Sequence, residues 1–272
     1  MDTLLFGISG LPRGDGRQKF TYATAIPYLR RCGLEAMELP FVRSVNVTAK
    51  NRDAIVRSKK ENDFFLSAHA SYYINLNAAE PDKHDASLDR IRQGGQALAL
   101  VDGRSLVFHP GYYLGQPAEQ VFATIRDNLR RLPDLGIDYR LETTGKGTQF
   151  GTIEELAGLC REVATCKPCI DFSHIHARGN GVLRREADFA KVLRAVADTL
   201  GPAALADMHI HISGIEYGPK GEKRHLSLGE SDFDYTACLK ALRAYGVKGC
   251  VICEDPMLEY DALLLKKTYR DL

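Results

Sequence analysis

The stretch "CIDFSHIHARGNG", residues 169–181, begins like a buried strand and ends with groups that bind metals. Its first two residues are apolar and suit a protein core. Asp171, His174 and His176 follow directly. A strand that only packs does not need a carboxylate and two imidazoles at its end, because such groups are costly to bury without partners. The stretch therefore predicts a strand whose carboxyl end carries chemistry.

Short apolar runs of this kind recur along the chain and alternate with amphipathic stretches of helical spacing. The candidate strands are residues 3–9, 33–41, 63–71, 105–111, 137–144, 168–174, 206–213 and 248–254. The candidate helices are residues 19–32, 48–61, 84–101, 117–136, 152–165, 186–200, 232–245 and 257–270. This alternation is typical of a (β/α)8 barrel. A doubly wound sheet is the alternative, but no G-x-G-x-x-G follows the first strand. We expect an α/β fold, a single TIM barrel forming one domain over residues 1–272.

The composition is that of an ordinary globular protein, with 44% hydrophobic and 26% charged residues. The formal net charge of +1 excludes a global basic field of the kind that attracts nucleic acid, although a local patch can still form. We see no apolar run of the roughly 20 residues that a membrane span needs, and no signal-peptide pattern. Seven cysteines, an odd number, favour reduced thiols. We expect a cytoplasmic monomer that does not bind membranes.

Two C-x-x-C pairs, Cys166/Cys169 and Cys250/Cys253, raise the question of a redox or zinc site. Both pairs lie in strand-like sequence. Residues three apart on a strand point to opposite faces, so they cannot converge on one metal. The pairs are therefore interpreted as buried structural thiols.

Residues of metal-ligand type recur at the ends of consecutive candidate strands. They are His69, His109, Glu142, Asp171 with His174, His209 with His211, and Glu254. In a barrel the carboxyl ends of all strands meet at one face. Each residue alone could be a satisfied core histidine or an ion-pair partner, but together they crowd one rim. Imidazoles mixed with carboxylates suit zinc or manganese. The set is too large for one tetrahedral ion, so we expect two or three ions.

Several segments, in this order, resemble the signature segments of endonuclease IV, the metal-dependent AP endonucleases of DNA repair, which are built on a TIM barrel. The segments are "SAHASYYINL", "FHPG", "LETTGKG", "IDFSH", "HIHISG" and "RHLSLGE". They extend over about residues 63–256. The resemblance implies a hydrolase of base excision repair. Such an enzyme cleaves the phosphodiester 5′ to an abasic site in DNA and leaves a 3′-hydroxyl.

The resemblance also implies a trinuclear zinc centre, with manganese as the alternative metal. The first ion takes His69 and His109, the second Asp171, His211 and Glu254, and the third His174 and His225. Glu142 bridges the first two ions, and Glu142 and Glu254 are the catalytic carboxylates. Glu254 orients or deprotonates the attacking water. His211 is preferred to His209 as the ligand, and because the two share strand parity, His209 is expected one layer deeper.

Two features differ from the family pattern. Lys223 stands where the family usually has an aspartate for the third metal, so Glu222 becomes a further candidate ligand. After the second strand, Arg43 is the only candidate for the family's arginine-rich probing loop. Tyr72 resembles the aromatic residue that stacks beside the lesion, with ordinary strand-end packing as the alternative. The predicted DNA contacts are Tyr72, Arg43, Arg178, Lys220 and Arg224.

The alternative function is that of a divalent-metal-dependent sugar isomerase or epimerase from the related xylose-isomerase-like barrels. That chemistry needs only the four ligands Glu142, Asp171, His211 and Glu254. The additional histidines distinguish the two functions, because they are surplus to an isomerase and required for a trinuclear nuclease. They are His69, His109, His174 and His225. A metal- or nucleic-acid-binding protein without activity is a third interpretation.

Overall fold

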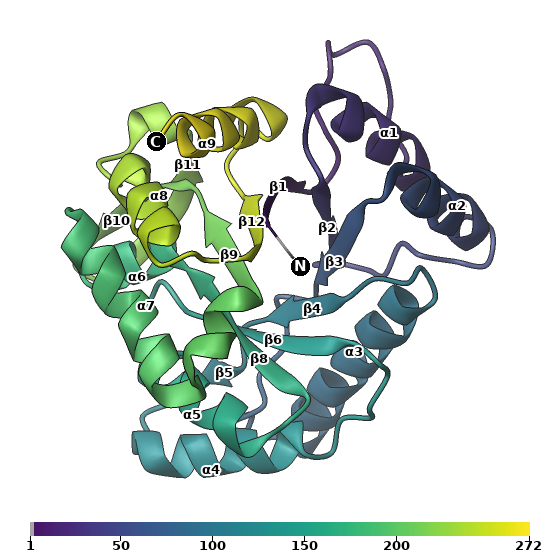
Figure 1. Cartoon of the computed structure of the whole chain (residues 1–272). Helices are drawn as coiled ribbons and strands as arrows, with labels where there is room; N and C mark the ends of the chain where they lie inside the picture. Colours follow the sequence, from purple (N-terminus) through teal and green to yellow (C-terminus); the bar gives the residue numbers. More distant parts are fainter. Residues whose placement is uncertain (1–2) are drawn as a thin grey trace.

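The structure is a computed structural model that describes residues 3–272. Its parallel strands close into a barrel in which the first strand pairs with both the second and the last (Figure 1). The barrel strands are β1 (Leu4–Ser9), β2 (Ala36–Pro40), β3 (Phe65–His69), β4 (Ser105–Phe108), β6 (Asp138–Glu142), β8 (Cys166–Asp171), β9 (Met208–Ile212) and β12 (Gly249–Cys253). The predicted (β/α)8 barrel is confirmed.

Helices surround this barrel (Figure 1). They are α1 (Tyr22–Cys32), α2 (Arg52–Asn62), α3 (Pro81–Ala99), α4 (Ala118–Leu129), α5 (Ile153–Glu162), α6 (Phe172–Arg178), α7 (Glu186–Leu200), α8 (Tyr235–Ala244), α9 (Glu259–Asp271) and the short 3-10 helices η1 (Pro202–Ala206) and η2 (Leu228–Glu230). The prediction of a helix over 117–136 was too long. Pro133, which has no backbone N–H, opposes its continuation, and the chain leaves the helix at Leu129. In residues 3–272 no helix combines the length and apolar character needed to cross a bilayer.

Three features that follow the barrel strands were not predicted: a short helix and two antiparallel pairs of strands. Residues 168–174 were expected to be one strand, but β8 ends at Asp171, whose Oδ1 accepts a hydrogen bond from the His174 backbone N–H (2.7 Å) and caps α6. His174 therefore lies in the first turn of a helix. The loop expected after the seventh strand is a hairpin of β10 (Gly214–Gly218) and β11 (Gly221–Leu226). A short antiparallel pair joins β5 (Gly111–Tyr112) to β7 (Gln149–Phe150).

The amino end of the barrel holds a cluster of opposite charges, which we call the basal ion-pair cluster. Its members are Arg104, Asp138, Arg140, Lys167 and Asp207. The buried Arg140 guanidinium lies 3.3 Å from a carboxylate oxygen of Asp138 and 3.3 Å from one of Asp207. Lys167 Nζ lies 2.7 Å from Asp207 Oδ2 and 3.0 Å from Asp138 Oδ1. Each carboxylate thus faces several cations of the chain itself.

Candidate metal centre

Glu142, the last residue of β6, lies at the centre of the candidate site. Its carboxylate is fully buried, and both oxygens contact imidazoles. Oε2 lies 3.0 Å from His69 Nε2 and 3.2 Å from His109 Nε2. Oε1 lies 3.0 Å from His211 Nδ1. Side chains from four strand ends therefore converge on one carboxylate, because parallel strands of a barrel end at the same face.

The tautomer of His69 follows from its outer contact. His69 Nδ1 lies 2.8 Å from the carbonyl oxygen of Ala70, which can only accept, so Nδ1 carries the proton. In the neutral ring, Nε2 then directs a lone pair at the Glu142 carboxylate. Two electron-rich atoms at this separation require a cation or an additional proton between them. The geometry fits a bound cation.

The pKa shifts of the metal-free chain reflect the same negative potential. Burial lowers the pKa of His69, but the hydrogen bond to Glu142 and its charge outweigh burial and raise the pKa to about 9. At His109 burial dominates and lowers the pKa to about 4, although Glu142 acts in the opposite direction. His109 therefore presents a neutral imidazole near neutral pH. A neutral imidazole is the form that binds metals.

A second group of possible ligands shares Glu142 with three other residues. Ligand atoms of Glu142, Asp171, His211 and Glu254 all lie within 4.8 Å of one another. Asp171 uses Oδ1 as the helix cap, while its buried Oδ2 has no hydrogen-bond partner within residues 3–272. Burial raises the pKa of Asp171 to about 6, although His174 acts against this. Because buried polar atoms are nearly always partnered, the orphaned oxygen also fits a cation.

A third group joins Asp171 to His174 and His225. The two imidazole Nε2 atoms lie 3.4 Å apart. His174 Nδ1 lies 3.0 Å from the carbonyl oxygen of Thr143, and His225 Nδ1 lies 2.9 Å from that of Glu254. Both Nδ1 atoms must donate, so both neutral rings direct a lone pair toward the other. Two facing lone pairs require a proton or a cation between them. In the metal-free chain burial lowers the pKa of His174, but the charges of Asp171 and Glu142 outweigh burial and raise the pKa to about 9, so a proton can fill this place, and a bound cation satisfies both rings.

Glu222 reaches this third group through the β10–β11 hairpin. Its Oε2 lies 3.6 Å from His174 Nε2, and its backbone N–H donates to the Gly145 carbonyl oxygen (2.9 Å). Gly221 has φ +91° and packs so closely on Gly145 that a Cβ would clash with its backbone. These two glycines therefore allow the hairpin to approach the loop between β6 and β7. The approach brings Glu222 to the histidines.

Lys223 does not enter the site, although it follows Glu222 directly. Its Nζ lies 3.2 Å from Glu216 Oε1 on the facing strand, and Arg224 Nε lies 2.7 Å from Glu216 Oε2. The register of the hairpin shifts here: Tyr217 pairs with Glu222 and Glu216 with Arg224, so Lys223 is the extra residue of a β-bulge. The hairpin thus gives Glu222 to the cluster and turns the Lys223 ammonium toward the exposed face.

The other predicted DNA contacts differ in their surroundings. Tyr72 is 63% exposed beside the cluster, with its ring centroid 5.8 Å from that of His69. Arg43 is exposed in a neighbouring cavity that Tyr73 and Arg90 also line. Lys220 is exposed at the hairpin turn. Arg178 is occupied: its guanidinium donates to Thr144 Oγ1 (2.6 Å) and to the carbonyl oxygens of Lys146 and Gln149 (2.8 Å each). In this arrangement Arg178 anchors the β6–β7 loop.

The ligand-type atoms open into a cavity of about 440 Å³ at the carboxyl end of the barrel. Its lining includes Tyr72, Tyr112, Lys146 and Gln149, together with His69, His109, Glu142 and His174 of the ligand groups. Glu222, His225 and Glu254 line it as well. The cavity gives a substrate direct access to the three groups.

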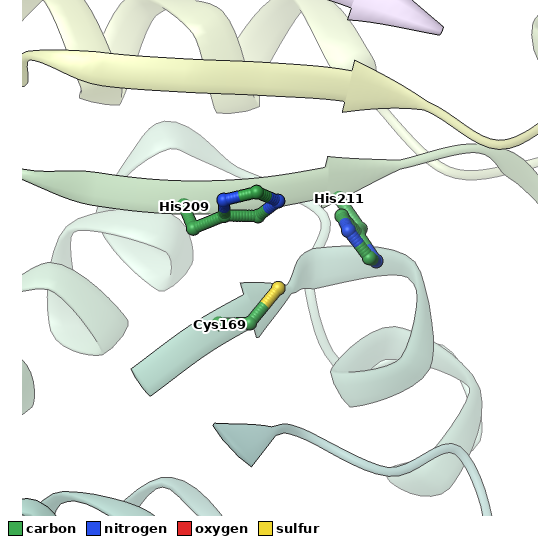
Figure 2. Close-up of side chains that lie close together, drawn as sticks. All are labelled: Cys169, His209 and His211. Atoms are coloured by element: carbon green, nitrogen blue, oxygen red, sulfur yellow. The ribbon is translucent and has the colours of Figure 1, made fainter. Parts of the chain in front are cut away.

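His209 and His211 lie in different layers, as Figure 2 shows. His211 reaches Glu142, whereas His209 Nε2 lies 2.9 Å from Glu38 Oε2 and its Nδ1 lies 3.3 Å from Cys250 Sγ. The expectation that His209 lies one layer deeper agrees with this geometry. The four cysteines of the two C-x-x-C pairs are free and buried, as predicted. His176 is buried as well, and its Nε2 lies 3.2 Å from Asp232 Oδ1.

Glu38 was missed in the sequence. This β2 residue is fully buried, and its carboxylate contacts both His209 and His211. The signal was a carboxylate within the apolar run "AMELP". The sequence predicts ligand-type groups at the carboxyl ends of strands, whereas Glu38 lies in the middle of its strand.

Comparisons with known proteins agree with this fold. An uncharacterized protein of Methanocaldococcus jannaschii is 46% identical over 99% of this chain and 98% of its own length. The probable endonuclease 4 of Bacillus subtilis is 29% identical over 62% of this chain, and the match spans 59% of that relative's length. Two solved structures share the fold, each with a TM-score of 0.75. Endonuclease IV from Thermus thermophilus is 20% identical, with 98% of both chains covered. A D-tagatose 3-epimerase-like protein is 17% identical, with 98% of this chain and 96% of its own covered.

A family model described as the xylose isomerase-like TIM barrel matches residues 26–267. This range includes every strand of the barrel except β1. The resemblance seen in the sequence therefore reflects relationship: the chain belongs to the xylose isomerase-like TIM barrel family and has relatives named endonuclease 4.

Proposed function

We propose that this protein is a metal-dependent phosphodiesterase that cleaves DNA 5′ to abasic sites and leaves a 3′-hydroxyl. The observation that carries the proposal is the pair His174 and His225, whose Nε2 atoms face each other at 3.4 Å beside Glu222. These residues lie outside the four-ligand group that suffices for sugar isomerisation. Together with His69 and His109, they give three ligand groups around one cavity. Three adjacent groups suit phosphoryl transfer, in which several negative oxygens need neutralising.

The proposed ligands follow from the three groups. Glu142 joins the first and second, and Asp171 joins the second and third. Zinc is proposed as the metal, with manganese as the alternative, because imidazoles and carboxylates suit both. Bound divalent ions supply hydroxide near neutral pH and neutralise charge on the attacking and leaving oxygens.

Glu254 is proposed to orient the attacking water. It lines the cavity. Burial alone raises its pKa, but the charge and the hydrogen bond of His211 together outweigh burial and lower the pKa below its usual value. An ionised carboxylate accepts a hydrogen bond from water and can take its proton. The water oxygen bonds to phosphorus as the P–O3′ bond breaks. The O3′ atom takes a proton and becomes the 3′-hydroxyl.

Contact with DNA is proposed to involve Tyr72, Arg43, Lys220 and Arg224. The exposed ring of Tyr72 beside His69 is suited to stacking on a base next to the lesion. The cations contribute phosphate contacts that weaken as salt rises. Arg178 is proposed to act indirectly, through the loop that carries Lys146 and Gln149 to the cavity.

A ketose epimerase is the second candidate. The group formed by Glu142, Asp171, His211 and Glu254 supports it, since these ligands alone could hold the metal of an isomerase. It does not account for the facing imidazoles of His174 and His225.

The test measures metal content and two activities on the same purified protein. We expect two or three zinc or manganese ions per chain and nicking of a duplex with one abasic site. The matched undamaged duplex is the control substrate. Failure of the fully loaded protein to nick abasic DNA, together with interconversion of D-fructose or D-tagatose with an epimer, would overturn the nuclease in favour of the epimerase.

A further inference from the structure

A second layer of polar groups lies beneath His211, inside the barrel. Glu38 Oε2 accepts hydrogen bonds from Ser67 Oγ (2.8 Å) and His209 Nε2 (2.9 Å). His211 Nε2 lies 3.1 Å from Glu38 Oε1. Ser67, His209, His211 and Glu38 are all buried at 1% exposure or less. Glu38, Ser67 and His209, which form this polar layer, serve no part of the proposed reaction directly, since they are buried beneath His211.

The protonation of these rings follows from their neighbours. The Cys250 thiol lies 3.3 Å from His209 Nδ1 and can donate to it, so His209 Nε2 carries the proton given to Glu38. Both nitrogens of His211 face carboxylate oxygens, Nε2 that of Glu38 and Nδ1 those of Glu142 and Glu254. With a cation held by Glu142 and Glu254, Nδ1 must present its lone pair, so the proton of the neutral ring then belongs on Nε2. His211 Nδ1 then has its lone pair directed at Glu142 and Glu254, at 3.0 and 3.4 Å.

The contact between Glu38 Oε1 and His211 Nε2 is not aligned as a hydrogen bond. Neither atom has a hydrogen-bond partner in the described chain, although 3.1 Å separates them. The terminal torsion of a histidine is soft, so a modest rotation of the ring aligns the N–H with the carboxylate. The ring thus has one acceptor available behind it and the candidate ligand group in front of it.

Glu38 is also an unusual residue to bury. Within residues 3–272 its ion-pair partners are the imidazoles of His209 and His211, with no arginine or lysine among them. A carboxylate without a permanent cation is costly inside a protein. Glu38 Oε2 accepts hydrogen bonds from both Ser67 and His209, as an ionised carboxylate can.

The other imidazoles of the site have different outer partners. His69, His174 and His225 each donate Nδ1–H to a backbone carbonyl oxygen and present Nε2 inward. His211 presents Nδ1 instead and has a carboxylate behind it. A charged partner increases the basicity of a ligand more than a neutral carbonyl does. The carboxylate of Glu38 should therefore make His211 a more basic ligand than the imidazoles that donate to a carbonyl oxygen.

We propose that Glu38 is a positioning residue that holds His211 in the Nε2–H tautomer, aims Nδ1 at the ligand group of Glu142 and Glu254, and strengthens its binding of a divalent ion. This inference rests on the proposed metal centre but not on the identity of the substrate. Ser67 and His209 orient the Glu38 carboxylate in turn.

The test compares Glu38→Gln with Ser67→Ala, which removes a neutral partner of the same carboxylate. Zinc is titrated into metal-free protein against a chromophoric chelator, without DNA. For Glu38→Gln we expect one ion of the set to bind about 10- to 100-fold more weakly and the others to be unaffected. For Ser67→Ala we expect a change below about threefold. Glu38→Asp keeps the charge and is expected to restore part of the affinity.

A second readout separates positioning from simple packing. Long-range 1H–15N spectra of the zinc-loaded protein report which nitrogen of His211 carries the proton. We expect Nε2–H in the wild type and in Glu38→Asp, and a changed His211 signal in Glu38→Gln. Wild-type zinc affinity for every ion in a folded Glu38→Gln variant, with an unchanged His211 signal, overturns the proposal. A wild-type protein that binds zinc but does not nick abasic DNA refutes only the proposed nuclease. One that binds no zinc, manganese or other divalent ion refutes both.

Discussion

The two ends of the barrel each gather ionisable groups but neutralise them differently. At the amino end, Asp138 and Asp207 face the cations of Arg104, Arg140 and Lys167. At the carboxyl end, the carboxylates face imidazoles, whose own lone pairs point at the same spaces. The same β6 strand contributes Arg140 to one end and Glu142 to the other.

The two clusters differ in the source of the positive charge that neutralises their carboxylates. The basal ion-pair cluster is neutralised by its own side chains, so it is complete when the chain folds. The upper cluster lacks an arginine or lysine within hydrogen-bond reach of Glu142 in the described residues. It must take up protons or cations from solution. We therefore interpret the lower cluster as a structural device and the upper cluster as a binding site.

The largest expected effect comes from removing the charge of Glu142. Glu142→Gln should lower abasic-site cleavage roughly a thousandfold or more, because loss of a bridging ligand removes several kcal/mol of charge stabilisation. Cleavage of abasic duplex and metal content are measured together. Glu119→Gln, an exposed carboxylate on α4, is the control and should behave as wild type. Near-normal cleavage by a metal-loaded Glu142→Gln protein contradicts the assignment of the bridge.

The opposite result is expected at the amino end. Arg140→Met should lower the free energy of unfolding by about 3–5 kcal/mol, because Asp138 and Asp207 lose a buried partner, while metal content stays unchanged. Urea unfolding of the metal-free proteins measures the change. The control Arg224→Met breaks an exposed pair with Glu216 and should cost below about 1 kcal/mol. Loss of metal from Arg140→Met at unchanged stability would mean that the two ends are not independent.

The smallest expected effect lies on the β10–β11 hairpin, where neighbouring residues point in different directions. Glu222→Gln should weaken the third ion by about tenfold, because a carboxylate near His174 loses its charge. In the Lys223→Ala variant, the affinity for that ion should be unchanged or slightly higher, because the substitution removes a positive charge from the hairpin. Elemental analysis after graded dialysis against a chelator measures both. Equal losses in the two variants would indicate that the hairpin acts only as a scaffold.

The barrel and most of the rim could be predicted from the sequence because both depend on local repetition. Each strand is a short apolar run, and residues such as His69, Glu142 and Glu254 stand where such runs end. The elements that bring Glu222 to His174 could not be predicted, because they depend on long-range packing. The approach of the hairpin requires Gly145 and Gly221, which lie far apart in the sequence.

Two further differences have the same origin. Arg178 was predicted to contact DNA because it is a cation after a strand, but the folded loop encloses its guanidinium with acceptors from residues 144–149. Glu38 was not predicted because the position of a residue along a strand indicates which face of the sheet its side chain lies on, but not which residue it contacts there. Its contact with His209, which lies 171 residues away, exists only in the closed barrel.

Closure of the barrel between its first and last strands has a consequence for biosynthesis. β1 pairs with β12, so Phe6 meets Val251 only after all the strands between them have been synthesised. Glu254 follows β12 directly, and pairings of such high contact order form slowly. A nascent chain that still lacks β12 exposes two unpaired strand edges, β1 and β9, and offers an incomplete set of ligands. Acquisition of the full complement of ions is therefore expected to follow the synthesis and pairing of β12.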